Sequence, residues 1–195
     1  MSLTFDQLRA ANMERVGQFK NKHGNLAHTK PDGSDWSPAQ WFKALVGELG
    51  ELAVAECEYQ IHGTASFAEP VRKEIADVQT YLGLFALRCL DRGPGLATRH
   101  AVDDSWAITG LVAALGTYAN ESKKFDRGDS NLTDLEVARY RLIGELHFWM
   151  HVISNVDLSA GAYRMTEIGT GVDLGEATRD KFNEVSERVG CAVRL

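Results

Sequence analysis

The segments LVGELGELA (residues 45–53) and KEIADVQTYL (residues 73–82) decide the fold class. Apolar residues recur in both at the three- and four-residue spacing of a buried helix face. Each segment also carries two acidic residues three positions apart, and such residues lie on the same face of a helix. The sequence therefore predicts two helices that each point a pair of carboxylates in one direction. The acidic residues are Glu48 and Glu51 in the first segment, and Glu74 and Asp77 in the second.

A divalent metal site would explain these four carboxylates. Two helices joined by a turn would set them face to face, among mainly apolar neighbours. Four carboxylates held together raise one another's pKa values, so they cannot all stay charged without a cation. Hard oxygen ligands in that number suit Mg²⁺, with Mn²⁺ as a substitute. The alternative is an ordinary solvated acidic face, since Glu184 and Glu187 show the same spacing without suggesting a site.

The composition is that of an ordinary globular protein. The 195 residues suffice for one well-buried domain, and 44% of them are hydrophobic and 25% charged. A net charge of −6 argues against nonspecific binding to the nucleic-acid backbone, which needs a basic face. Three widely spaced cysteines point to a reducing compartment and to buried thiols.

Neither a signal peptide nor a membrane span is expected. Residues 1–17 mix charged and apolar side chains at helical spacing, unlike a signal peptide. The longest uncharged stretch, residues 105–120, is too short and too rich in Gly, Thr and Asn to cross a bilayer comfortably. We therefore expect a cytoplasmic protein that binds neither nucleic acid nor a membrane.

Helical periodicity extends over most of the chain, and strand signals are weak, which predicts an all-α helical bundle. The first helix is expected from residue 4 to about residue 22, before a loop rich in Gly, Pro, Asn and Asp. Ser37 followed by Pro38 is a typical helix start. The further helices are expected at residues 37–61, from 66 or 70 to about 90, and at about 105–125, 134–155 and 176–189.

The middle of the chain repeats the pattern of the acidic segments. LVAALGTYA (residues 111–119) aligns with the first segment, and IGELHFWM (residues 143–150) aligns with the second. We interpret this as a degenerate duplication, a second helical hairpin that kept its packing and lost most of its ligands. The alternative is two amphipathic hairpins that converged in pattern. The aligned residues are Glu48 with Ala114, Glu51 with Thr117, and Asp77 with Glu145.

A single all-α domain over residues 1–195 is therefore expected. Residues 1–92 would carry the acidic metal-binding helices, and residues 96–170 the inserted or duplicated helical hairpin. Residues 172–190 would form a basic C-terminal helix.

With GELGEL followed by EIADV, the chain resembles the all-α nucleoside triphosphate pyrophosphohydrolases of the MazG-like and dimeric dUTPase-like superfamily. Their signature is ExxE on one helix and ExxD on the next. A basic segment after these helices in the family resembles LGEATRDKFNEVSER (residues 174–188). The chain departs from the family at Gly47, where MazG-like motifs often carry an additional glutamate, so any role of that carboxylate is in doubt. The resemblance covers roughly residues 36–92 and 172–190.

The resemblance implies Mg²⁺-dependent hydrolysis of a nucleoside triphosphate to the monophosphate and pyrophosphate. It implies that the four carboxylates bind metal, one of them instead holding the attacking water. Lys181 and Arg188 would contact phosphate oxygens, and Asn183 would bind phosphate, sugar or base. Trp41, next to the acidic helix, and Lys20, on the first helix, are candidates for substrate binding, although a large aromatic residue such as Trp41 is more often simply core.

Two other functions remain open from the sequence. The protein is alternatively a non-catalytic helical module that binds nucleotides or a protein partner, or a related metal-dependent phosphohydrolase acting on a nucleotide-like metabolite. The resemblance also allows two assemblies. The chain forms either a homodimer or a pseudo-dimer, in which the second hairpin takes the place of a partner subunit.

Overall fold

The computed structural model describes residues 3–20, 24–62, 65–89, 107–154 and 173–195. These residues form a bundle of six α-helices and contain no β-strand beyond isolated bridges, so the predicted all-α fold is confirmed. The expected boundaries of the inserted segment, near residues 92–96 and 170–172, lie outside the described residues. The helices are α1 (Phe5–Val16), α2 (Pro38–His62), α3 (Ala65–Cys89), α4 (Ala107–Asp126), α5 (Leu132–Ser154) and α6 (Leu174–Arg188).

The helices begin where side chains satisfy free backbone N–H groups. At α1, the Thr4 hydroxyl accepts a hydrogen bond from the Gln7 amide (3.2 Å), and the Gln7 side chain accepts one from the Thr4 amide (2.8 Å). The amide of Glu176 in α6 donates to Asp173 (2.8 Å). Helix α1 ends earlier than expected, because the chain turns at Gly17 instead of continuing to residue 22. The other boundaries fall within a few residues of the predicted ones.

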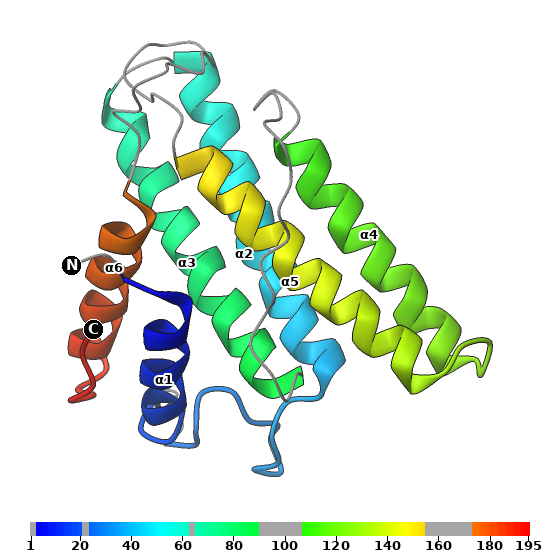
Figure 1. Cartoon of the computed structure of the whole chain (residues 1–195). Helices are drawn as coiled ribbons and strands as arrows, with labels where there is room; N and C mark the ends of the chain where they lie inside the picture. The colour runs from blue at the N-terminus through cyan, green and yellow to red at the C-terminus, as the bar shows by residue number, and fades with distance from the viewer. Residues whose placement is uncertain (1–2, 21–23, 63–64, 90–106, 155–172) are drawn as a thin grey trace.

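Helix α3 occupies the centre of the bundle. It pairs with α2 in one hairpin, and α1, α5 and α6 also pack against it. In Figure 1, α1 and α6 lie to the left of α3, and the hairpin of α4 and α5 lies to its right. The two hairpins also meet directly, since the ring of Tyr118 in α4 lies 4.8 Å from that of Phe42 in α2.

One apolar core joins the two hairpins. It consists of buried residues that recur at helical spacing along α2, α3 and α5. A smaller cluster joins α1 and α6 and includes Leu8, Ala11 and Phe182. Burial of these faces holds α2, α3 and α6 in fixed register. The main core includes Leu45, Leu49, Leu52, Ile75, Val78, Leu82, Phe85, Leu142, Ile143 and Leu146.

The three cysteines are free thiols. Cys89 and Cys191 are buried, as expected, but Cys57 is exposed on the outer side of α2. The expectation of a buried thiol was wrong there, because the apolar pattern of α2 continues onto its exposed face at Val54 and Ile61. Among the described residues, none of the helices combines the length and the apolar character that crossing a membrane requires.

Candidate metal centre

Three carboxylates from the first hairpin converge beside the core. One oxygen each of Glu48, Glu74 and Asp77 lies within 4.8 Å of the others. Glu74 and Asp77 are one turn apart on α3, and the packing of α2 against α3 brings Glu48 to the same place. All three side chains are half-buried, since their helix neighbours Leu49 and Ile75 belong to the core. We call these three residues the acidic triad.

The acidic triad fits a hard divalent cation. It offers carboxylate oxygens only, which are the ligands that Mg²⁺ and Mn²⁺ prefer. Oε2 of Glu74 is buried and has no hydrogen-bond partner among the described residues. A buried carboxylate oxygen without a partner costs free energy, which a bound cation would recover.

Burial raises the pKa values of all three carboxylates of the triad. Burial raises the pKa of Glu48 to about 7, and the charges of Asp77, Glu51 and Glu74 add to that effect. Burial and the charge of Asp77 raise the pKa of Glu74. Burial also raises the pKa of Asp77, against the opposing effect of Lys181. The three groups therefore favour a proton or a cation over full negative charge.

Glu51, the fourth predicted ligand, is not part of the triad. Its side chain is exposed, one turn further along α2. It still acts on the site through its charge, which raises the pKa values of Glu48 and Glu74. The structure thus brings together three of the four predicted carboxylates and leaves Glu51 at the edge.

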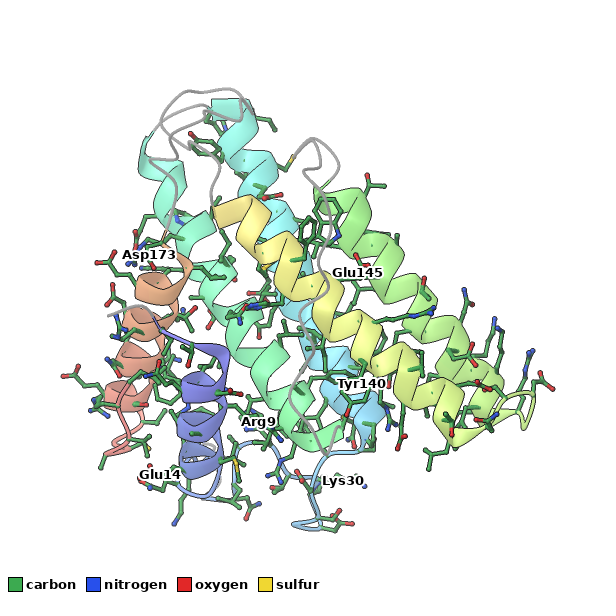
Figure 2. The ribbon with its side chains drawn as sticks, viewed as in Figure 1. Arg9, Glu14, Lys30, Tyr140, Glu145 and Asp173 are labelled. Carbon is green, nitrogen blue, oxygen red and sulfur yellow. The ribbon has the colours of Figure 1, made fainter. Side chains whose placement is uncertain are left out.

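Lys181 of α6, predicted to contact phosphate, forms an ion pair with a carboxylate of the triad. Nζ of Lys181 lies 3.0 Å from Oδ2 of Asp77. A second ion pair, 2.7 Å between Arg72 of α3 and Asp180, also ties α6 to α3. Figure 2 shows Asp173, which caps α6, at the start of that helix, beside α3.

Of the two other predicted residues of α6, one faces the site and one does not. Arg188 lies two turns after Lys181 on the same face, and both line one cavity. Asn183 lies on another face, and its side chain exchanges two hydrogen bonds with the backbone of Leu195 (2.9 and 3.3 Å). Asn183 therefore stabilises the segment after α6 and does not contact the site.

A cavity of about 190 Å³ opens beside the acidic triad. Its lining has three chemical parts, which are acidic, cationic and aromatic. The acidic part consists of Glu48 and Asp77, the cationic part of Arg15, Lys181 and Arg188, and the aromatic part of Phe19, His28, Tyr81 and Phe182. We call this space the triad cavity.

Arg15 is the cationic residue that sequence reasoning missed. It is only 7% exposed, and its guanidinium lies 3.7 Å above the ring of Phe182. It donates hydrogen bonds to the Phe182 carbonyl (3.2 Å) and to Oδ1 of Asn12 (3.4 Å), both neutral acceptors. Burial lowers the pKa of Arg15 to about 10, so it keeps its charge at neutral pH. A buried cation with neutral partners favours an anion in the cavity.

The two residues proposed from the N-terminal region, Lys20 and Trp41, do not line the triad cavity. Trp41 is 0% exposed and lies in the main core, with its ring 5.0 Å from that of Trp36. Lys20 is exposed and forms an isolated backbone bridge with Leu26. Their neighbour Phe19 does line the cavity. From this segment, Phe19 and not Lys20 therefore faces the cavity.

Comparison with known proteins does not assign the chain to a family. No protein-family model matches the chain, and neither a curated protein nor a solved structure matches it.

Proposed function

We propose that this protein is a divalent-metal-dependent nucleoside triphosphate pyrophosphohydrolase, which converts a nucleoside triphosphate to the monophosphate and pyrophosphate. The observation that carries the proposal is the triad cavity, where oxygen ligands for a cation and three basic side chains share one small space. Phosphate chains need this combination, because their charge is neutralised partly by a metal and partly by Lys or Arg. The motif resemblance described above points to the same reaction.

The acidic triad would hold Mg²⁺, with Mn²⁺ as a substitute. The bound cation would neutralise phosphate charge and polarise the phosphorus–oxygen bonds. Without a cation, the pKa of Glu48 is raised to about 7, so Glu48 is suited to hold the attacking water and accept its proton if Glu74 and Asp77 bind the cation. Glu51 contributes negative charge that keeps this pKa raised.

The basic side chains would bind the phosphate chain. Lys181 already contacts Asp77, so it lies next to the metal ligands and can move to a phosphate oxygen. Arg188 is exposed at the cavity and can contact the outer phosphates. Arg15 is held rigidly by Phe182 and Asn12, so it costs little conformational entropy to bind an anion. Together they would stabilise the pyrophosphate that leaves.

The second hairpin would act as an internal partner in this enzyme. One core joins α5 with α2 and α3, as a core would join two subunits. The chain would then be a pseudo-dimer and need fewer copies than simple members of the family. Sedimentation showing an obligate tetramer would contradict this part of the proposal.

A pyrophosphate-release screen tests the proposed reaction. The common ribo- and deoxyribonucleoside triphosphates are each incubated with the full chain and Mg²⁺, beside the variant Asp77→Asn. Release of pyrophosphate that the variant lacks supports the proposal. Release of inorganic phosphate alone would instead favour a related phosphohydrolase. If the folded protein releases no product from any triphosphate of the panel, a non-catalytic binding module is favoured.

A further inference from the structure

The loop between α1 and α2 delivers two side chains, Phe19 and His28, to the triad cavity. Backbone bridges on either side of His28, Lys20 with Leu26 and Thr29 with Asp35, fix the course of the loop. The Ala27 amide donates to the Phe19 carbonyl (2.8 Å). The backbone on both sides of His28 is thus held in place, and its ring lines the cavity.

Aromatic rings surround the imidazole of His28. The Phe19 ring stacks on it at 5.5 Å between centroids. The rings of Trp36, Trp41 and Tyr81 lie at 5.1, 5.0 and 6.0 Å. Phe19 and Tyr81 line the triad cavity together with His28, so part of its wall is aromatic. Flat aromatic walls of this kind are suited to stack a planar heterocycle.

His28 has an unpaired hydrogen-bonding atom, and its ring lines the aromatic part of the cavity. The residue is 9% exposed, and its Nδ1 is buried without a hydrogen-bond partner among the described residues. Burial, with the charges of Arg15 and Arg88, lowers the pKa of His28 to about 4. The ring is therefore neutral at physiological pH, with one nitrogen as donor and the other as acceptor.

A purely structural role does not explain this nitrogen. A phenylalanine would fill the same aromatic surroundings without leaving a buried polar atom unpaired. Asp77 and Lys181, where the phosphates of a nucleotide would bind, line the same cavity. A nucleotide whose phosphates bind there would have its base within reach of Phe19, His28 and Tyr81.

We infer that the aromatic part of the triad cavity, formed by Phe19, His28 and Tyr81, binds the nucleobase of the substrate, and that the imidazole of His28 forms a hydrogen bond with the edge of that base. His28 is then the specificity-determining residue, because bases differ in the donors and acceptors along their edges. Because the imidazole is neutral, it selects by hydrogen bonding and not by charge. This inference rests on the proposed function and adds to it the residue that recognises the base.

The test compares base preference in wild type, His28→Phe and His28→Asn. The phenylalanine keeps a ring and deletes both nitrogens, whereas asparagine places an amide atom close to the position of Nδ1. kcat/KM for pyrophosphate release is measured on each common triphosphate. Affinity for the α,β-imido analogues, which resist cleavage, is measured in parallel by calorimetry. His62→Phe is the matched control, because His62 is an exposed histidine paired with Glu58 on α2.

We expect wild type to prefer one base, and His28→Phe to reduce kcat/KM for that base by roughly 10- to 100-fold relative to the others, the equivalent of one lost hydrogen bond. His28→Asn should retain part of the preference, and His62→Phe all of it. A wild type without base preference, or a His28→Phe variant that keeps it, would overturn the inference and leave the proposed function intact.

Failure of the proposed function gives a different pattern. If no triphosphate is cleaved, the analogue affinities decide: base-dependent binding that His28→Phe abolishes supports the inference, and weak or base-independent binding overturns it. If His28→Phe does not fold, wild type is titrated with base analogues that each lack one edge group. A loss of affinity of roughly tenfold for one analogue supports the inference, and equal affinity for all of them contradicts it.

Discussion

The hairpins α2–α3 and α4–α5 have similar packing and different chemistry. In the first, Glu48 and Asp77 line the triad cavity. In the second, the aligned residues Ala114 and Glu145 line a cavity of about 250 Å³ between α4 and α5. Thr117, aligned with Glu51, lines the second cavity too. Figure 2 shows Glu145 on α5, on the side toward α4. Two aligned pairs thus each line a cavity, whereas Glu51, unlike Thr117, does not.

Because the second hairpin packs without these carboxylates, we infer that the first hairpin does not need them to fold. Both hairpins bury apolar faces in one core, and the second does so with Ala114 where the first has a glutamate. The carboxylates of the first hairpin raise one another's pKa values, which is unfavourable for stability at neutral pH. Groups kept at such a cost are typical of functional sites. The predictions below use the second hairpin as an internal control for the first.

The largest expected effect comes from removing one triad carboxylate. Asp77→Asn should lower Mg²⁺-dependent pyrophosphate release by roughly a hundredfold or more, because a charged metal ligand is replaced by a neutral amide. The aligned change Glu145→Gln should leave the rate within about twofold, as expected for a change outside the site. Steady-state rates for both variants are the measurement. Equal losses in the two variants would mean that the second hairpin is functional as well.

A smaller effect is expected from the basic residues that line the two cavities. Lys181→Gln should raise KM by roughly 10- to 100-fold, because a charge-assisted contact to phosphate is lost. Arg141 lines the cavity of the second hairpin, and Arg141→Gln should leave KM unchanged. Substrate titrations of the two variants check this. An unchanged KM in Lys181→Gln would remove this lysine from the phosphate site.

The third prediction concerns stability. Gly110 of α4 packs against Trp149, and a Cβ atom there would overlap the indole ring. Gly110→Ala should therefore lower the free energy of unfolding by about 1–3 kcal/mol. A Cβ atom added at Gly50 of α2 would meet open space. Gly50→Ala should therefore raise the free energy of unfolding by about 0.5–1 kcal/mol. Urea denaturation of both variants measures the difference, and effects of the same sign would contradict the prediction.

The smallest expected effect is a pH-dependent shift in melting temperature. In the folded protein without metal, Glu48 has a pKa of about 7, above its ordinary value of 4.5. The folded state therefore holds this proton more tightly than the unfolded state. Protonated Glu48 therefore stabilises the folded state fully below about pH 4.5, and this contribution is lost as the pH rises through 7.

Glu48→Gln cannot ionise, so it avoids this loss. At about pH 8 the metal-free variant should melt roughly 2–4 °C above wild type, and the difference should vanish near pH 4. Mg²⁺ should raise the melting temperature of wild type more than that of the variant. Calorimetry with and without Mg²⁺ measures both effects. A variant that melts below wild type at pH 8 would contradict the raised pKa.

Much of the fold follows from local sequence signals. The helix start at Ser37 and Pro38, together with the apolar periodicity, locates the helices to within a few residues. The end of α1 was wrong because the periodicity continues to Phe19, although the chain turns at Gly17 and Phe19 joins the loop. Periodicity records which residues are buried, and a buried loop residue gives the same signal as a helical one.

The candidate site was only partly predictable. Glu48, Glu74 and Asp77 follow from spacing, and Lys181 with Arg188 from the resemblance of residues 174–188 to the basic segment of the family. Glu51 shares that spacing but lies outside the triad, because the neighbouring helix is close to only part of each face. The different face of Asn183 could have been found from its angular position relative to Lys181 on a helical wheel.

The sequence by itself determined the all-α class, the helices and the pairing of carboxylates on α2 and α3, because these depend on spacing along one element. The tertiary structure alone decided that Arg15 and His28 join that site. Arg15 comes from α1, far along the chain from Phe182, on which it packs, and His28 comes from a loop without periodicity. Their places depend on how α1, α6 and the loop pack against α3, and no local pattern encodes a contact between such distant residues.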